Sequence, residues 1–530
     1  MASYIHPQLG NIKHLLSNGI RHFRGLKYAS LEHAFAVPRI QQGNGEGRTI
    51  DATHFGPTAV SPPMGCDMEL SLIQKPLPHK TFPMSTTECL NLNMSIPENH
   101  SGALPVFIFL HGGGYTIGSN AWPQYDLARL IQLSQDMKKP VIGITINYRL
   151  GVYGFLDSSN LRKAGVNPNR GLQDQQAALK WIQENIEGFG GDPKRVTLIG
   201  ESAGGVSGTL HIQSEELLFQ QLVAMGGTSL LLKPLSPPVS EIMYASVLER
   251  LQIDSKQSPE DQLKSLLAIT PETILSSVGP DLSLLPVIDG NIITSDIKFA
   301  QWSSPNIAAA APGIKRCRRV MFGDCQFDGS IMAFVLMPRK DNLVESFQTA
   351  MKAYVSDKPT DLEPIYKEYD ISSGTPSENV MKNILRFIND VQFYIPVVTM
   401  AKAWPGSAFV YHFNERNPWE GPHKGEANHI LDVAFLFQNF NDYLEVDQVK
   451  SAQRFGRDII TFVNGEDPYP KYNPQSGGAQ VYGSPFGPQG GFVISVNPAD
   501  YGRRAFVWQL GSKLGWDKLS TALDRFIAGI

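Results

Sequence analysis

Ser202 stands among four glycines in the stretch LIGESAGGVSG, residues 198–208. Ordered glycine costs conformational entropy, so such a cluster needs a steric reason. The five residues GESAG at 200–204 match the pattern G-x-S-x-G, which places a serine on a strained turn between a strand and a helix. The pattern predicts that Ser202 is a nucleophile exposed above a sheet. A plain glycine-rich turn is the alternative for this motif taken alone.

A serine nucleophile needs a base for its proton and N–H donors for the oxyanion that forms. The residues HGGG at 111–114 follow an apolar run and match the loop that supplies such donors beside the first strands of these sheets. We expect the backbone N–H groups of Gly113, Gly114 and Ala203 to form the oxyanion hole. Two matching motifs in one chain favour hydrolase-like chemistry. Neither phosphate-binding pattern, G-x-G-x-x-G or G-x-x-x-x-G-K-[ST], occurs in the serine stretch, which makes nucleotide binding the weaker hypothesis.

The segments around these motifs alternate between two kinds of pattern. Short apolar runs rich in β-branched or aromatic residues are typical of buried strands, and a 3.6-residue period indicates helices. The expected strands are 104–110, 140–148, 195–199, 318–324 and 407–413; the expected helices are 171–187, 341–355 and 379–404. Residues 466–491 are rich in Gly, Pro and Ser and are expected to be loop-rich. Strands separated by helices predict a parallel or mixed sheet covered on both faces.

Composition and charge exclude several classes of partner. The 530 residues are 42% hydrophobic and 18% charged with a formal net charge of −4, so no basic field exists to attract nucleic acid. No stretch approaches the roughly 18 apolar residues of a spanning helix, and the first 25 residues lack the apolar core of a secretory signal. We therefore expect a cytoplasmic protein without a membrane anchor. The four cysteines have no CxxC spacing and the histidines no HExxH spacing, so neither a metal nor another cofactor is expected.

Longer stretches carry a family resemblance. These are ECLNLNMSIP at 88–97, HGGGYTIG at 111–118, NYRLGVYGFL at 147–156, the run from GLQDQ to ESAGG at 171–205, and LLPVIDG at 284–290. With them the chain resembles the type-B carboxylesterase and cholinesterase family of α/β-hydrolases from about residue 20 to 470. The resemblance implies an α/β-hydrolase fold: one catalytic domain over 1–530, with a large, mostly parallel central sheet flanked by helices and insertions that form an active-site gorge.

In this fold the catalytic residues follow the order serine, acid, histidine. Three histidines lie far enough downstream, and His412 stands inside an apolar run where a structural histidine is expected. His429 directly precedes ILDVAFLF, where family members place the catalytic histidine. The resemblance therefore implies that His429 is the base, and His423 is then a residue of the loop EGPHKGEANHI.

Two aspartates follow the expected strand at 318–324. In the family the acid lies five residues after the strand's terminal glycine and precedes Gly-Ser or a similar pair, which fits Asp328 and not Asp324. Many relatives use glutamate, so Asp328 is one methylene shorter. Its role would be to accept the Nδ1 proton of His429 and stabilise the imidazolium. Glu201 also matches the family pattern and would add negative potential near His429, the alternative being a structural salt bridge.

The resemblance also bears on a cysteine pair and on one glycine. Cys66 and Cys89 resemble the family's first disulfide, whereas a cytosolic chain favours reduced thiols, so the pairing stays open. Relatives often carry a serine where Gly226 stands, so the hydrogen bonds behind Glu201 are expected to differ from theirs.

The chemistry predicted by these residues is hydrolysis of a carboxylic ester through an acyl-enzyme. The alternative is an acyltransferase, lactonase or cyclase that uses the same triad with another acceptor. A non-catalytic cholinesterase-like binding protein is a remote alternative, because such proteins typically lose the serine. The partner is a small-molecule ester; the sequence specifies neither which ester nor the oligomeric state.

Overall fold

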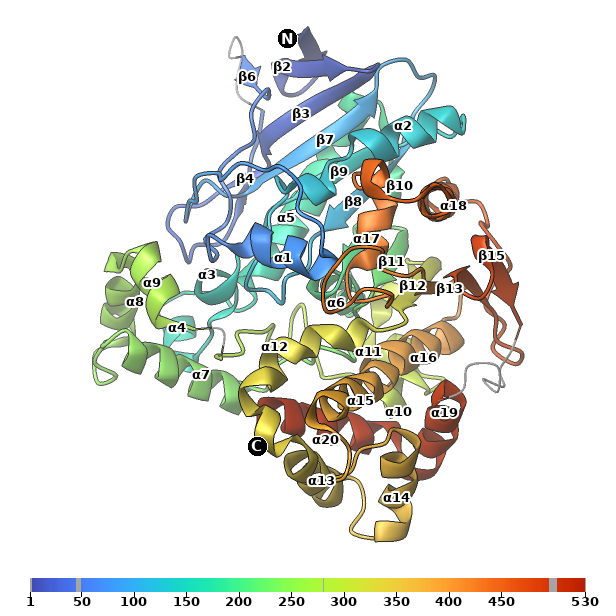
Figure 1. Ribbon diagram of the computed structural model, residues 1–530. Coiled ribbons are helices and arrows are strands. Elements are labelled where there is room, and N and C mark those ends of the chain that lie inside the picture. The colour runs from blue at the N-terminus through green and yellow to red at the C-terminus, as the bar shows by residue number, and fades with distance from the viewer. Residues whose placement is uncertain (1, 44–48, 280, 495–502, 530) are drawn as a thin grey trace.

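The computed structural model describes residues 2–43, 49–279, 281–494 and 503–529. Within these residues a 13-stranded sheet runs through the molecule in the order β1-β2-β3-β7-β9-β8-β10-β11-β12-β13-β14-β15, with β6 paired to β2 (Figure 1). Its strands are β1 (Ala2–His6), β2 (Gly10–Ser17), β3 (Ile20–Lys27), β6 (Ile50–Asp51), β7 (Asn91–Pro97), β8 (Leu104–Leu110), β9 (Ile142–Ile146), β10 (Gly191–Glu201), β11 (Gln221–Met225), β12 (Arg319–Cys325), β13 (Ser407–Asn414), β14 (Ala479–Gly483) and β15 (Gly487–Val493). A separate pair joins β4 (Ala29–Ser30) to β5 (Arg39–Ile40).

The centre of the sheet is parallel and its edges are antiparallel. Strands β9, β8, β10, β11, β12, β13 and β14 run parallel to one another. The pairs β1–β2, β2–β3, β3–β7, β7–β9 and β14–β15 are antiparallel, and the short β6 pairs parallel with β2. All seven residues of β8, LPVFIFL, are buried. A strand that is apolar at every position is buried on both faces, as expected for the parallel part of an α/β sheet.

Helices cover both faces of this sheet. They are α1 (Gly65–Ile73), α2 (Ala128–Asp136), α3 (Gly151–Phe155), α4 (Ser159–Lys163), α5 (Arg170–Asn185), α6 (Ala203–His211), α7 (Pro237–Arg250), α8 (Pro259–Ala268), α9 (Pro271–Ser277), α10 (Phe299–Trp302), α11 (Ile307–Ala310), α12 (Ala333–Leu336), α13 (Leu343–Tyr354), α14 (Pro359–Glu368), α15 (Ser377–Asn389), α16 (Ile395–Ala403), α17 (Leu431–Leu436), α18 (Val446–Val463), α19 (Arg503–Leu514) and α20 (Trp516–Ala528). A π-helical turn, Asp390–Tyr394, joins α15 to α16.

Alternate residues of each central strand enter two different hydrophobic clusters. In β8, Val106 and Ile108 pack with residues of α5, α6 and α16, while Phe107 and Phe109 pack with residues of α2, α17 and α18. Successive side chains of a strand point to opposite faces, so the two clusters are the cores on the two sides of the sheet. The sheet is therefore held in place from both sides, which fixes the strand ends from which the site is built.

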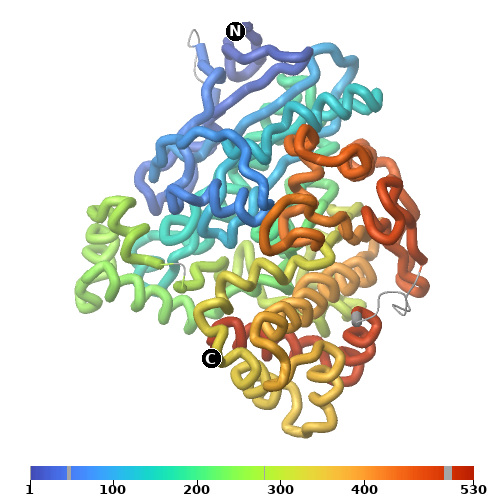
Figure 2. Tube along the Cα trace, viewed as in Figure 1, coloured from blue at the N-terminus to red at the C-terminus, as the bar shows by residue number. Residues whose placement is uncertain are grey.

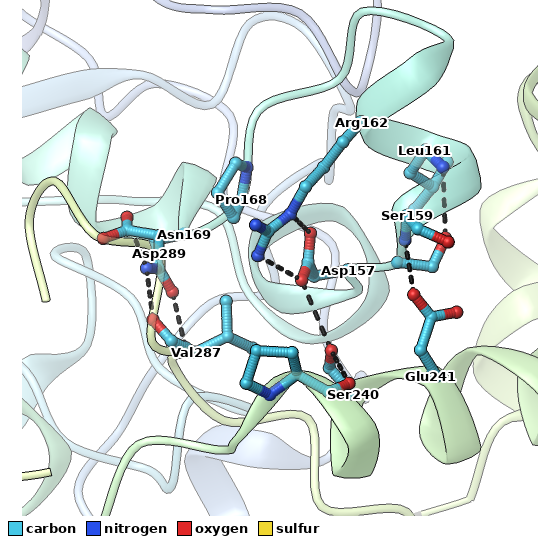
Figure 3. Close-up of polar contacts among 12 residues, drawn as sticks. Asp157, Ser159, Leu161, Arg162, Pro168, Asn169, Ser240, Glu241, Val287 and Asp289 are labelled. Carbon is cyan, nitrogen blue, oxygen red and sulfur yellow. Dashed lines mark hydrogen bonds and ion pairs between the residues drawn. The ribbon is translucent and has the colours of Figure 1, made fainter. Parts of the chain in front are cut away.

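The helices α7, α8 and α9 project to one side of the molecule (Figure 1) and are tied to the core by a polar network. Figure 3 shows the buried Asp157 receiving a two-pronged hydrogen bond from Arg162, with Nε and NH2 at 2.9 and 2.8 Å, and a hydrogen bond from Ser240 of α7. Asn169 donates to the carbonyl of Val287 and accepts from its N–H. The ion pair and the hydrogen bonds of the amide compensate the free energy that burial of these polar groups costs.

The C-terminal helices pack beside the segment that follows β12. Figure 2 shows α20 in red against α13 in yellow, and these two helices are in contact. Arg504 of α19 is buried, with its guanidinium 2.5 Å from Asp324 and 3.5 Å from Asp390, and it lies 4.4 Å from the ring centroid of Tyr394. His412 of β13 hydrogen-bonds to the other oxygen of Asp324. This buried network joins α19 to the ends of β12 and β13.

Residues 466–491 differ from the expected loop. Part of this segment forms β14, which pairs with β13, and most of β15, which pairs with β14. Strand pairing is a long-range interaction, and it stabilises this glycine-rich stretch in the sheet despite its turn-like composition.

Candidate active site

Ser202 occupies a sharp turn between β10 and α6. Its backbone has φ +51° and ψ −123°, a conformation that costs a non-glycine residue of order 1–3 kcal/mol. The turn requires glycine on both sides: a Cβ on Gly200 would lie 2.3 Å from backbone atoms of Gly204, and one on Gly204 would lie 2.1 Å from the carbonyl oxygen of Leu110. Glu201 and its neighbours in the turn are buried, whereas Ser202 stays partly exposed. The strained turn thus presents one hydroxyl outward.

The loop after β8 lies directly against this turn. A Cβ on Gly112 would stand 2.9 Å from the Cβ of Ser202. Gly113 and Gly114 follow with φ of +91° and +59°, values that favour glycine. In the described residues the N–H groups of Gly113, Gly114 and Ala203 donate to no protein acceptor. Unpaired N–H donors near a nucleophile are what an oxyanion hole requires, and the loop that carries two of them contacts Ser202 at Gly112.

The loops that carry the acid and the histidine are joined to each other. An isolated parallel bridge links Phe327 to Asn428, and the N–H of Phe327 donates to the carbonyl of Ala427 at 2.8 Å. The N–H of His429 donates to the hydroxyl of Ser330 at 3.2 Å. These contacts hold the residue before Asp328 and the residue before His429 in register.

His429 and Asp328 form a hydrogen-bonded pair. The distance from His429 Nδ1 to Asp328 Oδ1 is 2.7 Å, and both side chains are buried. The second carboxylate oxygen of Asp328 accepts the N–H of Cys325 at 2.6 Å. The shorter side chain therefore reaches the imidazole. Burial raises the pKa of Asp328, and the hydrogen bond from His429 opposes that rise.

The other ring nitrogen of His429 faces Glu201. The distance from Nε2 to Glu201 Oε1 is 3.2 Å, and both side chains are buried. In the described structure no hydrogen bond joins Nε2 to the Ser202 hydroxyl. Catalytic hydrogen bonds are often long or poorly aligned before substrate binds, so this geometry does not argue against the pair. Glu201 therefore lies directly beside the ring nitrogen of His429.

The electrostatics of this pair are strongly coupled. Burial opposes a charge on the imidazole, but the carboxylates of Glu201, Asp328 and Asp432 raise the pKa of His429 to about 9. Burial also raises the pKa of Glu201 well above its ordinary value, with the His429 imidazolium acting against it. When two groups interact this closely, the protons they bind belong to the pair.

Two buried carboxylates near this pair were not anticipated from the sequence. Asp432 accepts a hydrogen bond from the Tyr411 hydroxyl at 2.7 Å, and burial raises its pKa to about 6. Glu69 of α1 accepts hydrogen bonds from Gln124 and Tyr125, and burial raises its pKa to about 7. Asp432 could have been noticed three residues after His429. Glu69 has no comparable signal, because it lies far away in the sequence.

The other histidines and the other aspartate take different places. His412 pairs with Asp324 in the buried network that holds Arg504, as expected for a structural histidine. His423 lies in its loop, where its N–H donates to Gln74 and its ring is 6.4 Å from that of Phe327. Among the described residues, only His429 of the three is paired with Asp328.

Two features lie close around the His429 ring. Phe393 of the π-helical turn packs edge-on against it, with ring centroids 5.6 Å apart. Gly226, at the end of β11, has φ +51°, and a Cβ there would stand 3.3 Å from His429 Cε1 and 3.0 Å from Asp328 Oδ1. The missing side chain thus leaves space that the acid and the imidazole occupy.

The described residues contain no group of three or more potential metal ligands, and none of their helices is long and apolar enough to cross a membrane. The four cysteines are buried and free, so Cys66 and Cys89 are not bridged in this structure.

Comparisons with known proteins identify the family and the fold. The model of the carboxylesterase family matches residues 9–484. The para-nitrobenzyl esterase of Bacillus subtilis is 29% identical over 82% of this chain and 82% of its own length, and the cholinesterase of Mus musculus is 28% identical over 74% of this chain and 65% of its own. A solved PNB esterase superimposes with a TM-score of 0.75 at 24% identity, covering 94% of this chain and 98% of that one. The predicted family and fold are confirmed: the chain belongs to the carboxylesterase family, the carboxylic ester hydrolases of the α/β-hydrolase fold.

Proposed function

We propose that this enzyme hydrolyses small carboxylic esters through an acyl-enzyme, with Ser202 as nucleophile, His429 as general base and acid, and Asp328 as its partner. One observation carries the proposal: a serine held at φ +51° lies beside three unpaired N–H groups and a buried histidine–carboxylate pair. A base, a nucleophile and oxyanion donors are the three parts that acyl transfer needs.

In the first half-reaction, the Ser202 hydroxyl attacks the ester carbonyl and gives its proton to His429 Nε2. The hydrogen bond from Nδ1 to Asp328 keeps the proton on Nδ1, so that Nε2 carries the lone pair. The tetrahedral intermediate then collapses, the carbon–oxygen bond to the alcohol breaks, and the alcohol leaves with the proton from Nε2. The acyl group stays on Ser202.

In the second half-reaction, water gives a proton to Nε2 and attacks the acyl-enzyme carbonyl. The bond to Ser202 breaks, its oxygen recovers the proton, and the carboxylic acid leaves. In this proposal the N–H groups of Gly113, Gly114 and Ala203 hold the oxyanion in both steps, and one such donor contributes roughly 3–4 kcal/mol in known enzymes. Water is the expected acceptor; another alcohol or amine in its place would make the enzyme a transferase.

The proposal treats the whole chain as one catalytic domain. We also retain the cytoplasmic location predicted from the sequence, with which the four free thiols agree.

Steady-state and pre-steady-state hydrolysis of p-nitrophenyl esters of increasing acyl length tests this function. Ser202→Ala should abolish turnover, with a loss on the order of a million-fold, as in a comparable serine enzyme. His429→Gln should do the same, whereas His423→Gln, in the same loop, should keep wild-type rates. A phenol burst without turnover would assign the acyl-enzyme to an acceptor other than water. Undiminished turnover in Ser202→Ala would overturn the proposal.

A further inference from the structure

A cavity of about 680 Å³ lies outside the candidate triad, and the proposed reaction does not use it. Its walls come from β3, from the segment 53–55, from residues 78–82 and from the turn Pro123–Tyr125. None of the triad residues lines it. A volume of this size is within the range of small-molecule sites.

Aromatic rings form much of its wall. Phe55 and Phe82 stand edge to face with centroids 5.2 Å apart, and Trp122 and Tyr125 are nearly parallel with centroids 6.2 Å apart. Trp122 and Tyr125 are buried from the other side by the core that contains α1. Trp122 is 9% exposed and Tyr125 only 1% exposed, so Trp122 is the ring of this pair against which an apolar body can pack.

One cation in this wall, Arg24, has few interactions with the rest of the described protein. The guanidinium of Arg24 lies 4.3 Å from the centroid of Phe55, and its nearest carboxylate, Asp126, is 3.9 Å away. Within the described residues the guanidinium makes no hydrogen bond, although its side chain is only 29% exposed. A guanidinium has five N–H donors in a planar fork that matches a carboxylate. Apart from the 3.9 Å ion pair with Asp126, this fork has donors left for a carboxylate that binds at the cavity wall.

The other charged groups of the wall favour binding of an anion. Lys80 adds a second cation, against the single carboxylate of Asp126. The three histidines of the wall already have partners: His22 bonds to Ser17 and Ser95, His54 to Thr53, and His79 to Asp67.

We propose that this cavity binds a small organic anion, with its carboxylate on the Arg24 guanidinium and its aromatic or apolar body against Phe55, Phe82 and Trp122. The Phe55 ring lies 4.3 Å from the guanidinium carbon of Arg24 and limits where this cation can turn. A neutral molecule of the same shape lacks the charge-assisted hydrogen bonds, which are about twice as strong as neutral ones.

Calorimetric titration of the full chain with 3-phenylpropionate and with its neutral amide tests the proposal. The acid should bind wild-type protein at least tenfold more tightly than the amide. Arg24→Gln should weaken binding of the acid at least tenfold and remove its advantage over the amide. Arg21→Gln is the matched control: Arg21 is on the same strand, 26% exposed, and contacts Glu98 and Tyr4 outside the cavity, so this variant should bind as wild type does.

Phe55→Leu adds a second variant, and it should weaken the acid and the amide alike, because both lose the same ring contact. The comparison of acid with amide on wild-type protein needs no variant and therefore does not depend on folding of Arg24→Gln. Equal binding of acid and amide to wild type would overturn the proposal. So would full binding of the acid to Arg24→Gln, since that result would place the anion elsewhere, including near Ser202.

Discussion

His429 Nε2 lies 3.2 Å from Glu201 Oε1, and that buried oxygen has no hydrogen-bond partner in the described structure. The carboxylate thus faces the nitrogen that exchanges protons with the nucleophile and the leaving group in the proposed mechanism. Burying a single charge without a partner costs free energy. Here each group stabilises the ionised form of the other, the carboxylate of Glu201 and the imidazolium of His429.

Glu201→Gln should therefore shift the acid limb of the pH profile. The active form has neutral His429, and the Glu201 charge favours the imidazolium and raises the pKa of His429. Removing that charge lowers this pKa, so kcat/KM should persist to a pH lower by about one unit or more, equivalent to about 1.4 kcal/mol. The measurement is kcat/KM against pH, with the exposed Glu184→Gln as control. An unshifted limb would mean that Glu201 is already protonated while His429 titrates.

Asp328→Asn and Asp324→Asn should separate catalysis from stability. The amide in Asp328→Asn would leave the imidazole without its carboxylate acceptor and favour the wrong tautomer, at a cost of about 10⁴-fold in kcat by analogy with a serine protease. The amide in Asp324→Asn would instead leave Arg504 short of a buried carboxylate, lowering the free energy of unfolding by about 3 kcal/mol. Ester hydrolysis and denaturant unfolding of both variants distinguish the two roles. The expectation fails if Asp324→Asn loses activity while keeping its stability.

Gly226→Ala should impair turnover more than backbone strain alone explains. Both Gly226 and Gly290 have positive φ, so alanine at either costs about 1–2 kcal/mol of stability. Only at position 226 would the new Cβ press on Asp328 Oδ1 and His429 Cε1, whereas at 290 it would meet nothing within 4 Å. We expect kcat to fall roughly ten- to hundredfold in Gly226→Ala. Equal kcat in the two variants would contradict this explanation.

The thiols should be unreactive in the folded protein. Burial raises the pKa of both Cys66 and Cys89 to about 12, and the thiolate is the reactive form. Titration with a chromogenic disulfide should show no fast-reacting thiol in the native enzyme and all four cysteines after denaturation without reductant. Loss of two thiols from that count would show instead that Cys66 and Cys89 are bridged in the purified protein.

The parts of the site that share a local motif were predictable from the sequence. Ser202 and the loop at 111–114 each stand at the end of an apolar run, and parallel strands bring such ends to one edge of a sheet. The apolar run around His412 indicated a structural histidine, but the choice of Asp328 over Asp324 and of His429 over His423 needed the family resemblance. The structure pairs Asp328 with His429 and Asp324 with His412, and only the tertiary fold determines this choice.

Other features depended on contacts that the sequence does not show. Glu69 joins the group around His429 from α1, a helix far away in the sequence. Strands β14 and β15 form in a stretch of turn-like composition because β13 offers an edge to pair with. In both cases a long-range contact, and not a local preference, decides the outcome.

The order of strands has a consequence for how this site tolerates change. Ser202 follows β10 and Asp328 follows β12, with β11 between them. Neighbouring strands are about 4.8 Å apart, so the two chain exits are separated by about 10 Å, a gap that one imidazole ring with its two partners can bridge. The spacing of the strands thus sets the distance between the chain segments that carry Ser202 and Asp328. Insertions in the helices and loops leave this spacing intact, whereas an extra strand beside β11 would separate the nucleophile from its base.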